Sequence, residues 1–124
     1  MRGYIASRRE SFRWAFAGVA HVLRSQRNAW IHAAATVLVV AMSAWLRLAQ
    51  LEWALVVVAI AAVWIAEIAN TALEAVVDLV APEPHPLART AKDCAAGAVL
   101  VASGMAVVVG LLVLGPPLWD RLGA

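Results

Sequence analysis

The stretch that decides the fold lies between residues 51 and 80 and reads LEWALVVVAIAAVWIAEIANTALEAVVDLV. A helix needs roughly 20 apolar residues to cross the hydrocarbon core of a bilayer, and the first half of this stretch supplies most of them. The second half keeps the apolar background but adds the polar residues Glu67, Asn70, Glu74 and Asp78. At about 100° per residue, these four side chains share one face of a helix. The stretch therefore predicts a membrane-crossing helix with one polar face.

Two other segments of the chain are also long and apolar. Residues 28–46 contain no ionisable side chain other than His32, and residues 94–119 contain no charged side chain. Across the chain, 64% of residues are hydrophobic and 15% are charged. A typical soluble domain has about 45–50% and about 25%, respectively. The composition therefore argues against a soluble domain and against a nucleic-acid partner.

These segments predict an all-α integral membrane protein with a single domain over residues 1–124. An N-terminal amphipathic surface helix comes first, followed by three transmembrane helices. The expected ranges are about 4–27 for the surface helix, then 29–48, 52–80 and 91–116 for the three spans.

The surface helix is expected because the N-terminal arm is both basic and amphipathic. Six of the ten basic residues precede residue 28. Phe12, Phe16, Val19 and Leu23 fall on one helical stripe, and a helix of this kind lies flat on an anionic leaflet. The Lys/Arg bias places the N-terminus and the connection over residues 82–90 on the cytoplasmic side of the membrane.

The polar face has three competing interpretations. Its side chains could hold neighbouring helices together by hydrogen bonds, or they could carry the proton or ion of a coupled transporter. Alternatively, they could form a magnesium and phosphate site, because Mg²⁺ prefers oxygen ligands. Lys92 and Asp93 open the third span at the same membrane face as Glu74, which favours the phosphate site. Lys92 could equally be a topological anchor, and Asp93 could belong to a helix cap that begins at Thr90.

A phosphate site in this chain has to be built without a known nucleotide-binding loop. The sequence contains neither GxxxxGK[ST] nor GxGxxG. Soluble nucleotide-binding folds are therefore excluded, and any kinase activity must reside in the membrane helices.

The polar run has a recognisable pattern. EIANTALEAVVD at residues 67–78, EPHP at 83–86 and AKDCAAGAV at 91–99 together resemble the prokaryotic diacylglycerol kinase and undecaprenol kinase family. The resemblance extends over the whole chain. It implies a homotrimeric lipid kinase of the bacterial cytoplasmic (inner) membrane, with active sites shared between subunits. Such an enzyme uses ATP and Mg²⁺ to convert diacylglycerol to phosphatidic acid, or undecaprenol to undecaprenyl phosphate.

The resemblance also implies roles for individual residues. Glu67 matches the catalytic base, Asn70 an orienting amide and Glu74 a ligand of Mg²⁺. The residues that match ATP contacts are Trp14, Glu83, His85, Lys92 and Asp93.

One position departs from the family pattern. Gln26 stands where the best-known members have a second metal-binding glutamate, and an amide oxygen can ligate a hard cation but brings no charge. We therefore expect weaker Mg²⁺ binding. This departure keeps an alternative open, in which the chain is a weak or inactive homologue that acts as an oligomeric scaffold or ion-binding bundle. RNAWIH at residues 27–32 is closer to the undecaprenol kinase branch, but the sequence leaves the choice of lipid open.

Overall fold

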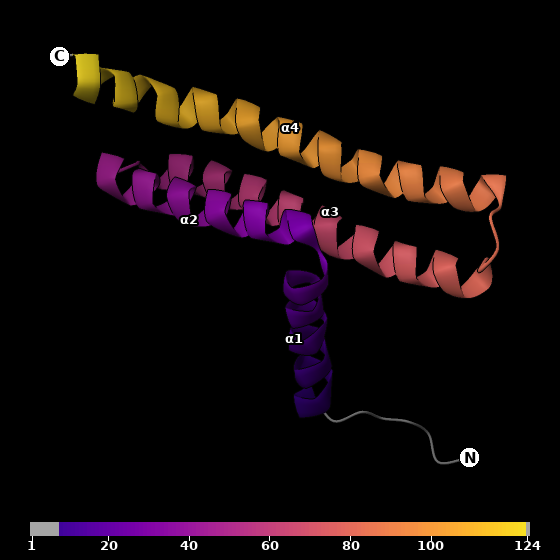
Figure 1. Cartoon of the computed structure of the whole chain (residues 1–124). Coiled ribbons are helices and arrows are strands. Elements are labelled where there is room, and N and C mark those ends of the chain that lie inside the picture. Colours follow the sequence, from indigo (N-terminus) through magenta and orange to yellow (C-terminus); the bar gives the residue numbers. More distant parts are fainter. Residues whose placement is uncertain (1–7, 124) are drawn as a thin grey trace.

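Helices account for almost all of the computed structural model, which describes residues 8–123 (Figure 1). They are α1 (Arg8–Ser25), α2 (Arg27–Leu46), α3 (Gln50–Val80) and α4 (Pro86–Gly123). Three of them, α2, α3 and α4, are long and apolar enough to cross a membrane. The prediction of an all-helical chain, with a shorter N-terminal helix and three helices of spanning length, is confirmed.

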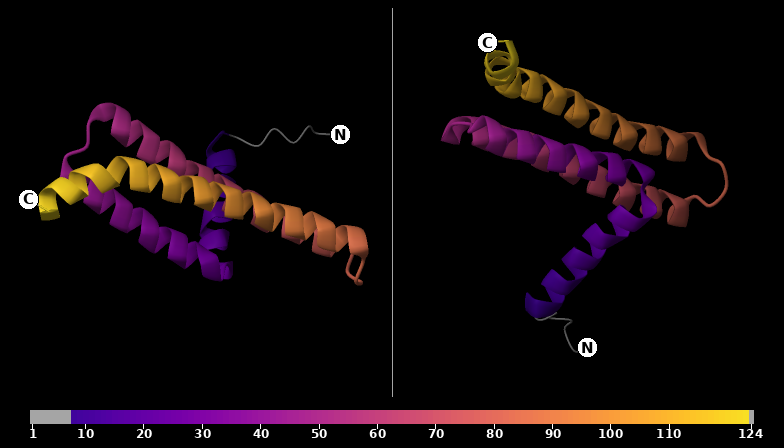
Figure 2. Two further views of the ribbon diagram at one scale, coloured as in Figure 1. Left: turned by 90° about the horizontal axis from the view of Figure 1, so that it is seen from above. Right: turned by 60° about the vertical axis from the view of Figure 1, so that its left-hand side comes forward.

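The three long helices form one layered bundle. α3 and α4 run antiparallel and are joined by a short loop over residues 81–85, while α2 packs against both (Figures 1 and 2). The buried contact between them is apolar and centres on Leu46, Val56 and Leu114. Most of the remaining apolar side chains point outward, as expected of helices whose surroundings are lipid or neighbouring chains.

α1 leaves the bundle at a single-residue junction and projects away from it (Figures 1 and 2). Gln26 is extended there, with φ −102° and ψ 120°. Val22 and Ala29 lie on either side of it and are fully or almost fully buried. The apolar side chains Phe12 and Phe16 are 66% and 72% exposed, so the other helices do not cover this part of the apolar stripe of α1. Its contact with a membrane surface stays a prediction, and residues 4–7 of the expected helix lie outside the described residues.

The ends of α4 differ from the expected span of 91–116. The helix begins earlier, at Pro86, because a proline fits the first turn of a helix, where its missing N–H is not needed. It also continues through Pro116 and Pro117 to Gly123. The part of α4 that lies inside a bilayer stays a prediction.

The turn between α2 and α3 depends on a left-handed residue. Arg47 has φ 55° and ψ 53°, and its N–H bonds the Ala44 carbonyl at 3.2 Å. The N–H of Leu48 bonds the Ser43 carbonyl at 3.2 Å, and the Glu52 carboxylate accepts a 2.7 Å bond from the Ala49 N–H. These bonds satisfy the backbone at the end of α2 and the start of α3.

Replacing Arg47 by glycine should stabilise this turn. A left-handed L-residue costs roughly 1–2 kcal/mol, part of which the greater backbone entropy of glycine in the unfolded state offsets. We expect Arg47→Gly to raise the unfolding free energy by about 0.5–1 kcal/mol, as measured by thermal unfolding in detergent. Arg47→Ala is the matched control, because it removes the same side chain and keeps the penalty. Equal stability of the two variants would contradict the prediction.

Candidate active site

Glu67 is the most deeply buried charged residue in the part of the chain that the structure describes. It lies on α3 with a relative exposure of 2%. The Nε2 atom of His32, on α2, approaches Glu67 Oε2 at 3.5 Å. A carboxylate placed within an apolar bundle is costly unless it faces a partner or water. Within residues 8–123, His32 supplies the polar group that faces this carboxylate, at a distance longer than a normal hydrogen bond.

A short run of polar residues follows Glu67 on α3, one and two helical turns further along the chain. The Thr71 hydroxyl donates to the Glu67 backbone carbonyl at 3.0 Å. The Asn70 side-chain amide donates to Glu74 Oε1 at 3.3 Å. Asn70 and Thr71 are both buried, whereas Glu74 is partly exposed. The helical spacing therefore brings Glu67, Asn70 and Glu74 to one face, as predicted.

Two buried oxygens in this run have no hydrogen-bond donor within residues 8–123, namely Glu67 Oε2 and Asn70 Oδ1. An unsatisfied buried acceptor costs about 1–3 kcal/mol, so such atoms mark places where water or an ion binds. Asn70 Oδ1 and the Glu74 carboxylate are hard oxygen donors and fit Mg²⁺. No group of three His, Cys, Asp or Glu residues in the described part of the chain could hold a metal ion. Further ligands would have to come from phosphate, water or another chain, which is the usual manner of Mg²⁺ binding.

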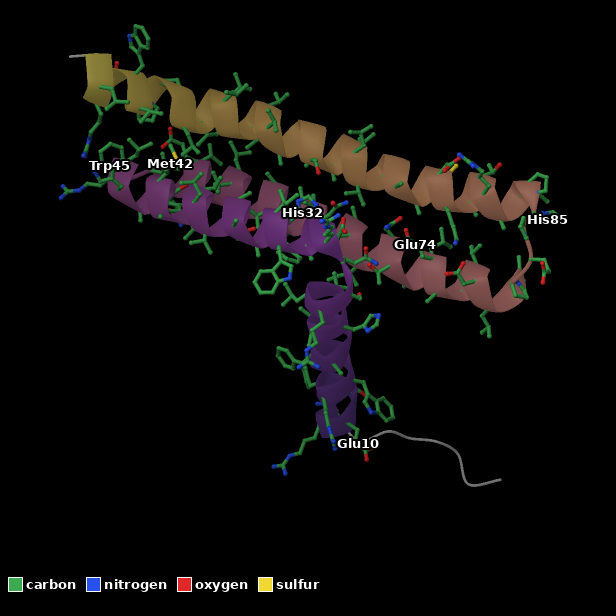
Figure 3. The ribbon with its side chains drawn as sticks, in the orientation of Figure 1. Glu10, His32, Met42, Trp45, Glu74 and His85 are labelled. Carbon is green, nitrogen blue, oxygen red and sulfur yellow. The ribbon has the colours of Figure 1, made fainter. Side chains whose placement is uncertain are left out.

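A second polar feature is a surface cleft where the α3–α4 loop meets the first turns of α4. Its polar lining consists of Asp78, Glu83, His85, Arg89, Lys92 and Asp93. Lys92 Nζ donates to Asp78 Oδ1 across the helical hairpin, and Arg89 pairs with Asp93 at 3.7 Å. Figure 3 shows Glu74 between His32 and His85 along the length of the bundle. The polar run lies on α3 and the cleft at the end of the α3–α4 hairpin, with Glu74 at the end of the run that is nearer to the cleft.

The structure brings most of the predicted site residues into these two features, but two remain apart from them. Trp14 lies on α1, which projects from the bundle, and it does not line the cleft. Gln26 lies at the α1–α2 junction, where its side chain makes no cap hydrogen bond. The roles predicted for the individual residues stay predictions.

Two neighbours of the predicted site were missed in the sequence. Asp78 was placed on the polar face without a role, yet it pairs with Lys92 because the short loop returns α4 beside α3. His32 was noted only as an exception in an apolar segment. Its signal was available, since an ionisable residue in a membrane span needs a polar partner, but sequence spacing could not identify Glu67 as that partner.

The polar run and the cleft lie in the part of the chain that is similar to a known protein family. The sequence model of prokaryotic diacylglycerol kinase matches residues 13–114. The chain belongs to this family of lipid kinases. The predicted resemblance is therefore confirmed.

Curated relatives in this family carry two names. A diacylglycerol kinase from Synechocystis is 48% identical over 109 residues, which cover 87% of this chain and 62% of the relative. An undecaprenol kinase from Bacillus subtilis is 38% identical over 109 residues, with 88% and 89% covered. A diacylglycerol kinase from Escherichia coli is 36% identical over 104 residues, with 78% and 82% covered. The chain thus spans less than two thirds of the Synechocystis relative and most of the other two.

The Lys92–Asp78 pair should contribute little to the stability of this family member. The two side chains are 40% and 66% exposed, and exposed ion pairs are typically worth about 0.2–1 kcal/mol. We expect Lys92→Met and Asp78→Asn each to lower the unfolding free energy by less than about 1 kcal/mol, measured by denaturant unfolding in detergent micelles. The double variant should be no worse than the sum of the two. A loss above about 2 kcal/mol from either change would show that the pair is structural.

Proposed function

We propose that this chain transfers the γ-phosphoryl group of ATP to the hydroxyl of a membrane lipid alcohol in a Mg²⁺-dependent reaction. The observation that carries the proposal is the buried Glu67 carboxylate, which lies two helical turns from Glu74 in a chain of the lipid kinase family. A carboxylate at this depth can accept a proton from an alcohol that stays in the bilayer.

The transfer needs positioning and neutralisation of charge more than covalent chemistry. A bond forms between the lipid oxygen and the γ-phosphorus, and the bond from that phosphorus to the β–γ bridging oxygen breaks, so that ADP leaves. Glu67 takes the proton of the lipid hydroxyl. Asn70 holds Glu74 through its amide. Lys92 offers a positive charge to the phosphates, for which its present partner, Asp78, would have to yield.

Asn70 and Glu74 are the residues that would hold Mg²⁺, with Gln26 as a further candidate ligand. When bound, the ion would neutralise phosphate charge and orient the phosphates. ATP would occupy the cleft beside Glu83, His85, Lys92 and Asp93. This assignment is supported by the cleft's position at the end of the hairpin and by the Lys92 ammonium group within it.

We also propose that the protein acts as a homotrimer in the bacterial cytoplasmic membrane, with the α3–α4 loop and the N-terminus on the cytoplasmic side. Trp14 supports shared sites, because α1 of one chain points away from that chain's own cleft. The unsatisfied Asn70 Oδ1 supports them as well. The substrate is diacylglycerol or undecaprenol, and the proposed chemistry fits both, since each has a primary alcohol that a carboxylate can deprotonate.

The first test is transfer of labelled γ-phosphate from ATP to each lipid, with purified protein in mild detergent and Mg²⁺. Removing the base should lower the rate by about 10²–10⁴-fold, which is the usual contribution of general base catalysis. We therefore expect Glu67→Gln to abolish labelling of either lipid while the protein stays folded and still binds ATP. Full activity of the variant would disprove the role of Glu67. No labelling by the wild-type protein would favour the alternative of an inactive scaffold or ion-binding bundle.

A second test addresses the metal. Replacing Gln26 by glutamate adds a negative charge where Mg²⁺ binding is proposed, and the number of charged ligands tunes cation affinity. Gln26→Glu should lower the Mg²⁺ concentration that gives half-maximal activity by several-fold, whereas the uncharged Gln26→Met should raise it. The measurement is a Mg²⁺ titration of the kinase rate at saturating ATP. An unchanged midpoint in both variants would place Gln26 outside the metal site.

A further inference from the structure

His32 is the side chain that faces the proposed base, and it comes from a different helix. We propose that His32 is a positioning residue that holds Glu67 Oε2, so that the other carboxylate oxygen is directed to the lipid hydroxyl. This inference rests on the proposed function, because it explains how the proposed base, Glu67, is oriented. It starts from the 3.5 Å approach of His32 Nε2 to Glu67 Oε2.

The carboxylate has little else to hold it in place. Glu67 Oε2 is buried and has no hydrogen-bond donor within residues 8–123. The last torsion of a glutamate side chain is broad and roughly two-fold, so a carboxylate without a fixed neighbour has no single orientation. A donor beside one oxygen removes that freedom. At 3.5 Å the contact is longer than a normal hydrogen bond, but catalytic contacts often tighten only when the substrate binds.

The imidazole of His32 contacts Trp64 on α3, and Trp64 is in turn hydrogen-bonded to α2. Its ring meets the ring of Trp64 edge to face, with the centroids 6.3 Å apart and an interplanar angle of 69°. The Trp64 indole N–H donates to the Thr36 hydroxyl at 3.0 Å. That hydroxyl donates to the His32 backbone carbonyl at 2.7 Å. His32, Trp64 and Thr36 therefore form a closed ring of contacts across the α2–α3 interface, and Glu67 joins this ring through His32.

A histidine on an apolar helix is often only a packed side chain. Here the side chain is 17% exposed while its carboxylate partner is 2% exposed. The Glu67 carboxylate is the more deeply buried of the two groups, so it is the one that needs a polar neighbour. A role in packing alone would predict that any side chain of similar size serves, whereas a role in positioning requires a donor at the place of Nε2.

Two substitutions at position 32 distinguish these roles. His32→Gln keeps an N–H donor close to the place of Nε2, and His32→Leu removes it at similar size. Loss of an outer-shell residue that orients a metal ligand typically costs about 10–100-fold, and we expect the same range for a residue that orients a base. We expect His32→Leu to lower kcat by this factor, with the KM values for ATP and lipid within about threefold of wild type. His32→Gln should recover most of kcat. An unchanged kcat in His32→Leu, or equal losses in both variants, would overturn the proposal.

A second measurement tests the contact without enzymatic turnover. The chain has three histidines, His21, His32 and His85, and their ring nitrogens can be followed by ¹⁵N NMR of the labelled full-length protein. Glu67→Gln should shift the Nε2 resonance of His32 and leave the other two unchanged. No shift would overturn the proposal even if the wild-type protein is an active kinase. A shift in a protein that phosphorylates neither lipid would support the contact and reject the proposed function alone.

Discussion

The arrangement of this protein depends on a carboxylate that lies where water is scarce. Glu67 is buried at the start of the polar run on α3, and the cost of burying such a charge requires a polar neighbour. In the described part of the chain, that neighbour is His32 on α2. This requirement favours the register of α2 against α3 in which the two residues meet. The Trp64–Thr36 hydrogen bond lies one turn away and satisfies two polar groups in the same interface.

The α3–α4 hairpin meets a second requirement, which is to place charged side chains at one end of an apolar bundle. The loop over 81–85 is short, so α4 returns directly beside the end of α3. Lys92 therefore meets Asp78, and Glu83 and His85 stand at the same cleft. The exposed end of the hairpin carries the groups suited to a soluble, phosphate-bearing molecule. The buried part of α3 carries the group suited to an alcohol in the lipid phase. A reaction between a soluble and a membrane-bound substrate needs both.

Much of this could be predicted from the sequence, because it follows from local periodicity. The spacing of Glu67, Asn70 and Glu74 determines that they share a face of any helix they form, and the length of the apolar segments determines the number of spanning helices. The start of α4 at Pro86 was missed because residues 82–90, which include three prolines, were all taken as a connection, although a proline is favoured at a first helical position. The pairing of His32 with Glu67 could not be predicted from the sequence, since it depends on the rotation and register of α2 against α3. Trp14 was assigned from the family pattern alone, and in a single chain it lies away from the cleft.

The single extended residue between α1 and α2 has a consequence for how position 26 can vary. The backbone of Gln26 sets the direction in which α1 leaves the bundle, while its side chain makes no cap hydrogen bond. The direction of α1 is therefore determined by the backbone at this position and not by a side-chain bond at the helix cap. The φ of −102° and ψ of 120° at Gln26 lie in the extended region that any L-residue adopts, so the side chain at position 26 can be exchanged while the direction of the amphipathic arm is kept.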